Sequence, residues 1–250
     1  MILLLGGTSE SLQIADELTK RRLSFILSVT TDYGEALAKK HTQQVSKQTL
    51  TSDTFNKFLN NHHIQLIIDA THPFARVISI TAMEMAKKSN VKYIRFERSN
   101  LFKTSPYLKL VANLKAACDY LKSLSGTVYL STGSKTAEEY AKSLGIQRLH
   151  IRVLPTERVL TQLTTIGFEA DQIDAIEGPF GTNLNFELFK KADAVAVVTK
   201  ESGRRGGVQE KITACEQLKI PCIIIKRPTI QYPNQVGTFD ELWQEMKVLC

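Results

Sequence analysis

Short apolar runs alternate with amphipathic stretches along almost the whole chain. Runs such as Ile2–Leu5 have the length of a buried strand, and between the runs apolar residues recur at the i, i+3 and i+4 spacing of a helix. This alternation is typical of a parallel sheet with helices on its faces. The strands expected in the first part are Ile2–Leu5, Phe25–Val29, Gln43–Ser46, Leu66–Ala70 and Lys92–Arg95, and the helices are Glu10–Arg21, Tyr33–Lys40, Ser52–Asn61 and Phe74–Lys88.

The polar segment Ser99–Pro106 has no period and separates this pattern from a second one of the same kind. We therefore expect an α/β protein with two Rossmann-like domains and mainly parallel sheets, residues 1–98 and 99–250, with closing strands or the tail free to pack across the boundary. The second part predicts strands at Leu108–Val111, Val128–Ser131, Leu149–Val153, Ile173–Ile176, Ala194–Thr199 and Cys222–Lys226, and helices at Asn113–Ser123, Lys135–Leu144, Glu157–Thr165, Asn183–Lys191, Val208–Leu218 and Asp240–Lys247.

The two parts begin alike. Ile2–Leu5 runs into Gly-Gly-Thr-Ser, and Val128–Ser131 runs into Thr-Gly-Ser, so in both a buried strand ends at a turn of small residues that opens a helix. Open α/β sheets bind ligands at the carboxyl ends of their strands. The two turns therefore predict an active-site cleft between the domains.

The composition is that of a globular protein, and we expect it in the cytoplasm. Of the 250 residues, 43% are hydrophobic and 23% are charged. No apolar run approaches the roughly 20 residues of a membrane helix, and Ile2–Leu5 lacks the basic segment that precedes a secretory signal. The cysteines show neither CxxC spacing nor a nearby histidine pair, which indicates free thiols and no metal site; they are Cys118, Cys215, Cys222 and Cys250.

The formal net charge of +7 raises the question of a polyanionic partner. Nucleic acid and membrane are not expected, because the basic residues are scattered and no helix-turn-helix, zinc-finger or RNP pattern occurs. Instead, cations recur where predicted strands end, which suits a ligand with several carboxylates. They are Arg95, Arg98, Lys135, Arg152 and Lys200, although each by itself is more often a solvated surface charge.

The turn after the first strand is a candidate phosphate site. Gly6 and Gly7 let the backbone approach a ligand, and Thr8, Ser9 and the helix amides can donate to it. The GxGxxG fingerprint fails, so the alternative is a plain turn with a serine N-cap. After the second strand, Thr30 and Thr31 suit a phosphate and Asp32 suits a ribose hydroxyl, which leaves NADPH and NADH both open as the cofactor.

His72 is the candidate catalytic residue, because it follows the fourth strand in Asp69-Ala-Thr-His-Pro-Phe-Ala75 and so lies on the ligand side of the sheet. A single histidine is more often structural, and Asp69 can simply brace the turn. The chain lacks the residues that are typical of several other enzyme classes. No tyrosine has a lysine four positions on, no Walker A lysine follows Gly6, and there is no GxSxG sequence.

Taken in order, the motifs make the chain similar to the precorrin-6A reductase family, which includes the cobalt-precorrin-6A reductases of the anaerobic cobalamin pathway. The similarity runs from end to end. The matching segments are Gly6-Gly-Thr-Ser-Glu10, Asp69-Ala-Thr-His-Pro-Phe-Ala75, Arg95-Phe-Glu-Arg98, Thr132-Gly-Ser-Lys135, Arg152-Val-Leu-Pro155, Gly178-Pro-Phe180, Thr199-Lys-Glu-Ser-Gly203 with Gly207, Glu210-Lys211 and Ile220-Pro221. Glu177 departs from the family, since an uncharged residue is expected before Gly178.

The resemblance implies a coenzyme domain, a tetrapyrrole domain, and reduction of one ring double bond of (cobalt-)precorrin-6A to (cobalt-)precorrin-6B. A hydride would pass from the coenzyme to one carbon, and the neighbouring carbon would be protonated, with His72 as the first choice of donor. Transient contact with neighbouring pathway enzymes is a further expectation. The residues expected to bind coenzyme are Gly6, Gly7, Thr8, Ser9, Thr30 and Thr31, and those expected to bind the substrate are Ser134, Lys135, Arg152, Lys200, Ser202, Gly203 and Lys211.

Two other functions are compatible with the pattern. Gly-Gly-Thr after the first strand also occurs in extended short-chain epimerases and dehydrogenases, although the missing Tyr-x-x-x-Lys counts against that class. A non-catalytic dinucleotide or tetrapyrrole binder would use the same residues and show no turnover.

Overall fold

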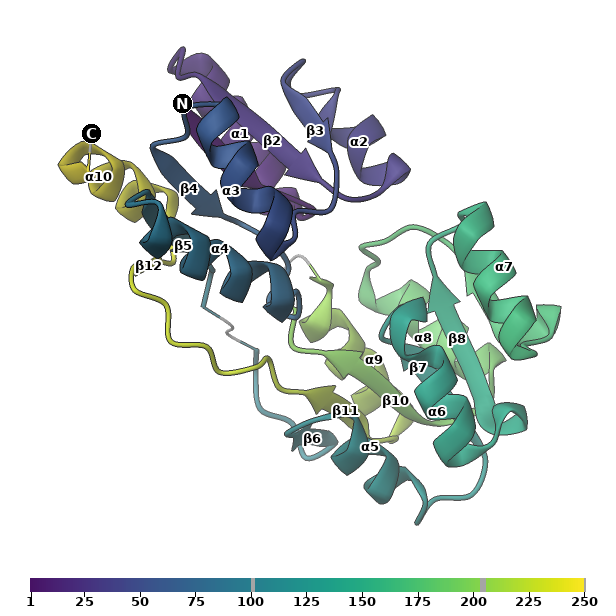
Figure 1. The fold of residues 1–250 in the computed structure, drawn as a ribbon. Coiled ribbons are helices and arrows are strands. Elements are labelled where there is room, and N and C mark those ends of the chain that lie inside the picture. The colour runs from purple at the N-terminus through teal and green to yellow at the C-terminus, as the bar shows by residue number, and fades with distance from the viewer. Residues whose placement is uncertain (100–101, 203–205, 250) are drawn as a thin grey trace. The chain divides into compact units, whose positions relative to one another are not determined.

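The computed structural model describes residues 1–99, 102–202 and 206–249, and its chain divides into two compact units (Figure 1). Unit 1 contains residues 1–99 and 228–250, and unit 2 contains residues 100–227. Each unit is an α/β fold with one six-stranded sheet in which every pairing is parallel. The predicted fold class is confirmed.

Unit 1 has the strand order β12-β5-β4-β1-β2-β3. Its inner strands β1, β2 and β4 are buried along their whole length, which explains why they are apolar runs rather than alternating ones. Its elements are β1 (Ile2–Leu5), α1 (Ser9–Lys20), β2 (Phe25–Val29), α2 (Asp32–Ala38), β3 (Val45–Lys47), α3 (Ser52–Asn61), β4 (Leu66–Asp69), α4 (Arg76–Lys88), β5 (Lys92–Phe96), β12 (Gln235–Val236) and α10 (Phe239–Leu249).

Unit 2 has the strand order β6-β11-β10-β7-β8-β9. Its longer elements are β6 (Leu108–Val111), α5 (Leu114–Leu121), β7 (Thr127–Ser131), α6 (Ala137–Leu144), β8 (Leu149–Val153), α7 (Glu157–Ile166), β9 (Ile173–Ala175), α8 (Thr182–Lys191), β10 (Ala194–Lys200), α9 (Val208–Leu218) and β11 (Cys222–Ile225). Three short 3₁₀ turns are η1 (Ser134–Thr136), η2 (Ile146–Arg148) and η3 (Ala170–Gln172).

The five core strands of the two sheets have the same order, although the edge strand comes last in unit 1 and first in unit 2. In each, the first strand of the Rossmann-like core (β1 or β7) is central, the next two strands follow on one side, the fourth and fifth follow on the other, and one extra strand closes the edge. The strand order therefore reverses between β1 and β4 in unit 1 and between β7 and β10 in unit 2. Ligands of open α/β sheets bind at such switch points, and the two similar turns of the sequence come directly after β1 and β7.

Apolar side chains from alternate positions of the strands fill both faces of the unit 1 sheet. Leu4 and Ile68 contribute to one face, which α1 and α10 cover, whereas Leu3 and Ile67 contribute to the other, which α3 and α4 cover. In unit 2, α8 and α9 cover a face through Phe189 and its neighbours. These layers fix the carboxyl ends of the strands, where the site residues lie.

The C-terminal segment differs from the sequence-based boundary. The second domain was expected to run to residue 250, with its closing strands or tail free to pack across the boundary, and residues 228–250 belong to unit 1. The physical reason is twofold: β12 pairs with β5, and Leu242 and Met246 of α10 are buried in the unit 1 core. The sequence did not predict β12, and α4 begins at Arg76 rather than Phe74. No helix in the described ranges is long and apolar enough to cross a bilayer.

Candidate functional site

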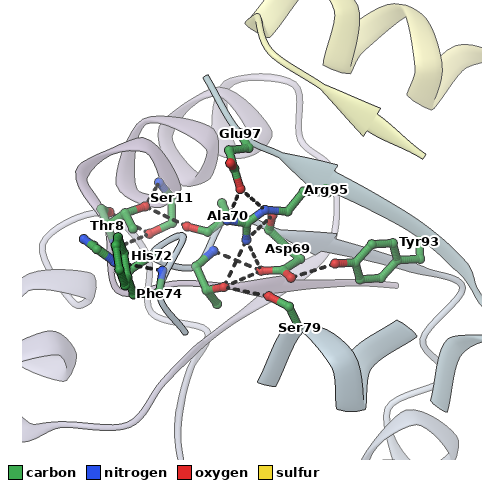
Figure 2. A network of polar contacts seen from close by, with 11 residues as sticks. Thr8, Ser11, Asp69, Ala70, His72, Phe74, Ser79, Tyr93, Arg95 and Glu97 are labelled. Carbon is green, nitrogen blue, oxygen red and sulfur yellow. Dashed lines mark hydrogen bonds and ion pairs between the residues drawn. The ribbon is translucent and has the colours of Figure 1, made fainter. Parts of the chain in front are cut away.

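The switch point of unit 1 brings the turn after β1 next to the end of β4. The Thr8 hydroxyl donates a hydrogen bond to the carbonyl of Ala70 (2.7 Å), two residues before His72. Thr8, not a serine, is also the N-cap of α1: its hydroxyl accepts from the Ser11 amide, and its own amide donates to the Ser11 hydroxyl (3.3 Å). The polar atoms of Thr8 therefore connect β1, β4 and α1, as Figure 2 shows.

The two glycines of this turn, Gly6 and Gly7, lie in different environments. A Cβ on Gly6 would lie 2.7 Å from Leu27 Cδ1 and 3.3 Å from the Ser28 carbonyl oxygen, so a larger residue would have to displace the Leu27 side chain. Gly7 is exposed and has φ +104°, a backbone conformation that other residues rarely adopt. Ser9 is also exposed and begins α1, a helix of 12 residues whose first amides have no partner within the helix. A phosphate could therefore reach the backbone of Gly7 and Ser9.

The end of β2 holds charges of both signs. Thr30 is exposed, and the Thr31 hydroxyl caps α2 by accepting from the Gly34 amide (3.0 Å). Lys47 Nζ on β3 lies 2.5 Å from an Asp32 oxygen and 3.1 Å from Glu35, and hydrogen bonds to these acids raise the pKa of Lys47. The sequence analysis missed Lys47, because its position beside β2 depends on the sheet register.

His72 is half-buried, and its Nδ1 accepts a hydrogen bond from the Phe74 amide (3.2 Å). The neutral imidazole therefore carries its hydrogen on Nε2. The structure thus places His72 beside the turn that holds Gly6, Gly7 and Thr8, on the same side of the unit 1 sheet.

Behind His72 lies a buried ion-pair network (Figure 2). Asp69 and Arg95 are both 0% exposed, and Arg95 NH1 donates to Asp69 Oδ1 at 2.9 Å. Arg95 also pairs with Glu97 at 2.7 Å, while the other Asp69 oxygen accepts from the Tyr93 hydroxyl at 2.7 Å. The Thr71 hydroxyl donates to Asp69 Oδ1 at 2.7 Å. This network fixes the end of β4 from which the His72 loop leaves.

The prediction that Arg95 is a ligand-binding cation is wrong. Its side chain is fully buried, and two carboxylates neutralise it within the protein. Burial opposes ionisation of Asp69, but the Arg95 guanidinium and the hydroxyl donors outweigh that effect and lower the pKa of Asp69. Asp69 braces the turn, which was the structural alternative for this residue.

Arg152 of unit 2 has a different environment. It is 8% exposed, and its guanidinium donates to Asn185 Oδ1 (2.9 Å) and to the Ser131 hydroxyl (2.8 Å), both of them neutral. It also lies 4.9 Å from the Phe180 ring centroid. No carboxylate oxygen in the described part of the chain lies within 4.0 Å of it. Burial lowers the pKa of Arg152.

Two lysines share this end of the unit 2 sheet. Lys211 of α9 is buried and donates to the Gly206 carbonyl (2.7 Å) and the Thr199 hydroxyl (3.3 Å). Its burial, with a further contribution from the Arg152 charge, lowers the pKa of Lys211 to about 8. Lys200 donates to the Thr132 carbonyl (2.8 Å), and burial and then the Lys135 charge lower the pKa of Lys200. Like charges therefore gather here.

The remaining residues that were predicted to bind the substrate differ in their burial and contacts. Ser134 is buried at the start of η1, and its carbonyl accepts from Gln162 Nε2 (3.2 Å), whereas Lys135 is exposed. The Ser202 amide donates to the Lys200 carbonyl at 2.7 Å. Gly203 lies outside the described residues.

Several polar residues of unit 2 were missed by the sequence analysis. Asn185 supports Arg152, and a buried group of Tyr129, His150 and Asp174 lies beside it. Single polar residues within apolar strands carry no motif, so only the strand register could have found them. Within the ranges that the structure covers, no cluster of three or more His, Cys, Asp or Glu side chains could hold a metal ion.

Comparison with known proteins covers almost the whole chain. The family model described as precorrin-6x reductase CbiJ/CobK matches residues 1–247. A cobalt-precorrin-6A reductase of Methanococcus maripaludis is 36% identical over 246 residues, covering 97% of both chains. One of Priestia megaterium is 32% identical over 245 residues, covering 97% of this chain and 96% of the relative.

A solved structure, "CobK precorrin-6A reductase", has a TM-score of 0.81. It covers 99% of this chain and 96% of its own, with 22% sequence identity. This similarity supports the fold.

The Asp69–Arg95 pair predicts a specific loss of stability in acid. Because the pKa of Asp69 is lowered from 3.8, its ionised form stabilises the fold above that pH, and the contribution disappears as the pH falls through the lowered value. We expect Asp69→Asn to reduce the free energy of unfolding by about 3–5 kcal/mol at pH 7 and by less at pH 3, measured by urea denaturation. The exposed Asp53→Asn is the control. Equal losses at both pH values would contradict this account.

Proposed function

This chain belongs to the precorrin-6x reductase CbiJ/CobK family and is a precorrin-6A or cobalt-precorrin-6A reductase of cobalamin biosynthesis, and we propose that a reduced nicotinamide coenzyme is its electron donor. The observation that carries the reaction is the match of the family over residues 1–247. The proposals below assign parts of that reaction to residues.

We assign the coenzyme to the switch point of unit 1. Gly7 and Ser9 are exposed at the start of α1, where backbone amides and the helix dipole favour a phosphate. Thr8 contributes by holding this turn to β4, and Gly6 by close packing against β2. Thr30 and Thr31 lie at the end of β2, where a Rossmann fold receives the adenosine ribose.

We assign the carboxylates of the tetrapyrrole to unit 2. Arg152 and Lys211 are buried cations whose hydrogen-bond partners are neutral, and burial, together with the Arg152 charge, lowers the pKa of Lys211. A bound carboxylate would relieve that cost and add charge-assisted hydrogen bonds. Lys200, Lys135 and the Ser202 segment extend the same positively charged end of the sheet, a set that suits a ligand with several acidic arms.

When bound, the nicotinamide supplies the hydride, so the protein's part is to hold the reacting carbons together and exclude water. In this assignment Arg152 orients the substrate through its acidic arms. The Asp69–Arg95 network keeps the His72 loop in place, because it fixes the end of β4.

We propose His72 as the proton donor for the neighbouring carbon. Its Nδ1 accepts from the Phe74 amide, which orients the ring and leaves Nε2 as the nitrogen that carries the hydrogen.

The reaction itself has a direct test. Purified protein should oxidise NADH or NADPH, followed as loss of nicotinamide absorbance, only when precorrin-6A or cobalt-precorrin-6A is added. Running both substrates with both coenzymes also determines the preference for each. No substrate-dependent oxidation in any of the four combinations would refute the proposal.

The substrate assignment predicts a selective effect at Arg152. Arg152→Gln should raise the KM for the tetrapyrrole about 10- to 100-fold, as loss of one charge-assisted contact implies, with the coenzyme KM within about twofold of the original. Lys200→Ala should act in the same direction. The exposed Arg158→Gln on α7 is the control for net charge. An equal rise in both KM values would argue against separate binding units.

The proton-donor assignment predicts a change in the pH profile. His72→Gln should lower kcat and remove the decline of kcat on the alkaline side, since glutamine has no titrating proton to lose. Steady-state rates between pH 5 and 9 would measure this. A variant that keeps the original profile would exclude His72 as the donor.

A further inference from the structure

Unit 2 contains a buried polar group that the proposed function does not use. Tyr129 of β7, His150 of β8 and Asp174 of β9 are at most 8% exposed. The Tyr129 hydroxyl donates to Asp174 Oδ2 at 2.6 Å, and His150 Nε2 lies 3.0 Å from the same oxygen. The Tyr129 and His150 rings stack, with centroids 5.1 Å apart and 15° between their planes. Such a group is costly to bury and calls for an explanation.

The strand register places this group beside Arg152. Arg152 is the register partner of Asp174, and Tyr129 is the partner of His150, two residues before Arg152 on β8. Because side chains two residues apart leave the same face of a strand, these four side chains share one face of the sheet. Ser131, which accepts from Arg152, follows Tyr129 by two positions and lies on that face as well.

Asp174 is the carboxylate that a buried arginine at position 152 would be expected to pair with. Its Oδ2 instead receives the Tyr129 hydroxyl and faces His150, and no ion pair with Arg152 forms. Tyr129 lies between the two charges: its ring centroid is 5.9 Å from the guanidinium carbon. Both Tyr129 and Asp174 counteract the effect of burial on Arg152 and support its charged form, as the causes of its lowered pKa show.

Tyr129 and Asp174 therefore support the charge of Arg152 without an ion pair that would occupy its guanidinium. Within the described ranges the Arg152 guanidinium donates to Asn185 and Ser131 and is also supported by the Tyr129 side chain, which leaves part of its five hydrogens open. The Tyr129 hydroxyl hydrogen points to Asp174, so its oxygen presents lone pairs elsewhere. Without Asp174 that hydrogen would be free to turn toward the guanidinium and repel it.

We propose that Asp174 is a positioning residue for substrate recognition: by accepting the Tyr129 hydroxyl, it holds Tyr129 and Arg152 so that the open donors of Arg152 are available to a carboxylate of the substrate. This inference rests on the proposed function, because it takes Arg152 as a residue that binds the tetrapyrrole. His150, which stacks on Tyr129 and lies close to the same carboxylate, holds the Tyr129 ring in its orientation.

Graded substitutions test the proposal. Asp174→Ala removes the acceptor, and Tyr129→Phe removes only the hydroxyl and keeps the ring. Both should raise the KM for the tetrapyrrole about tenfold and leave kcat and the coenzyme KM within about twofold. Asp174→Asn retains an oxygen that can accept from Tyr129, so it should stay within about threefold of the original KM.

Two outcomes would overturn the inference. If Asp174 simply opposed substrate binding through its negative charge, Asp174→Asn and Asp174→Ala would both lower the substrate KM. If the group were only structural, kcat and both KM values would deteriorate together with thermal stability. Tyr129→Phe keeps the test valid if Asp174→Ala does not fold, since it deletes a single oxygen.

Arg152→Gln, measured in the same series, separates this inference from its premise. A normal substrate KM in Arg152→Gln would refute the assignment of the carboxylate to Arg152. A raised KM in Arg152→Gln with a normal KM in both Asp174→Ala and Tyr129→Phe would refute only the positioning role of Asp174.

Discussion

The compensation of buried positive charge is the interaction on which the rest of the structure depends. A cation taken out of water must be paired or hydrogen-bonded, or it destabilises the fold. Unit 1 meets this requirement internally, because Asp69 and Glu97 neutralise the fully buried Arg95. Unit 2 leaves Arg152 with neutral acceptors at the carboxyl ends of its strands. The first arrangement stabilises a scaffold, and the second is the one that our proposal assigns to an acidic ligand.

Because the core strands of the two sheets have the same order, this difference in charge compensation gives each unit its own proposed role. Each sheet has its switch point beside its central strand, β1 or β7, and each central strand ends in a turn of small residues. In unit 1 the turn exposes Gly7 and Ser9 at a helix start, the arrangement that suits a phosphate. In unit 2 the neighbouring strand ends bring together cations, which suits carboxylates. In the proposed function, one fold that is used twice supplies both anion sites, one for the coenzyme phosphate and one for the substrate carboxylates.

The sequence predicted the fold well, because strands buried on both faces leave continuous apolar runs that periodicity detects. It could not predict β12, since this strand is two residues long and exists only through its pairing with β5. At the proposed site, Thr8, Arg152 and Lys211 were predicted from their positions after strands or in motifs, and their ligand roles stay predictions. Arg95 resembled them in sequence, and only the cross-strand contact with Asp69 distinguishes it. Asn185 and Asp174 were missed for the same reason, because their partners are distant in the chain.

The central claim is that Arg152, whose charge Tyr129 and Asp174 support without an ion pair among the described residues, receives a carboxylate of the tetrapyrrole. The most direct test is a crystal structure of the full chain with precorrin-6A or its cobalt form bound. This account predicts a substrate carboxylate within hydrogen-bond distance of the Arg152 guanidinium, with the contacts of Arg152 to Asn185 and Ser131 retained. A bound substrate whose carboxylates are all held by other residues, with Arg152 unchanged and remote from them, would contradict it.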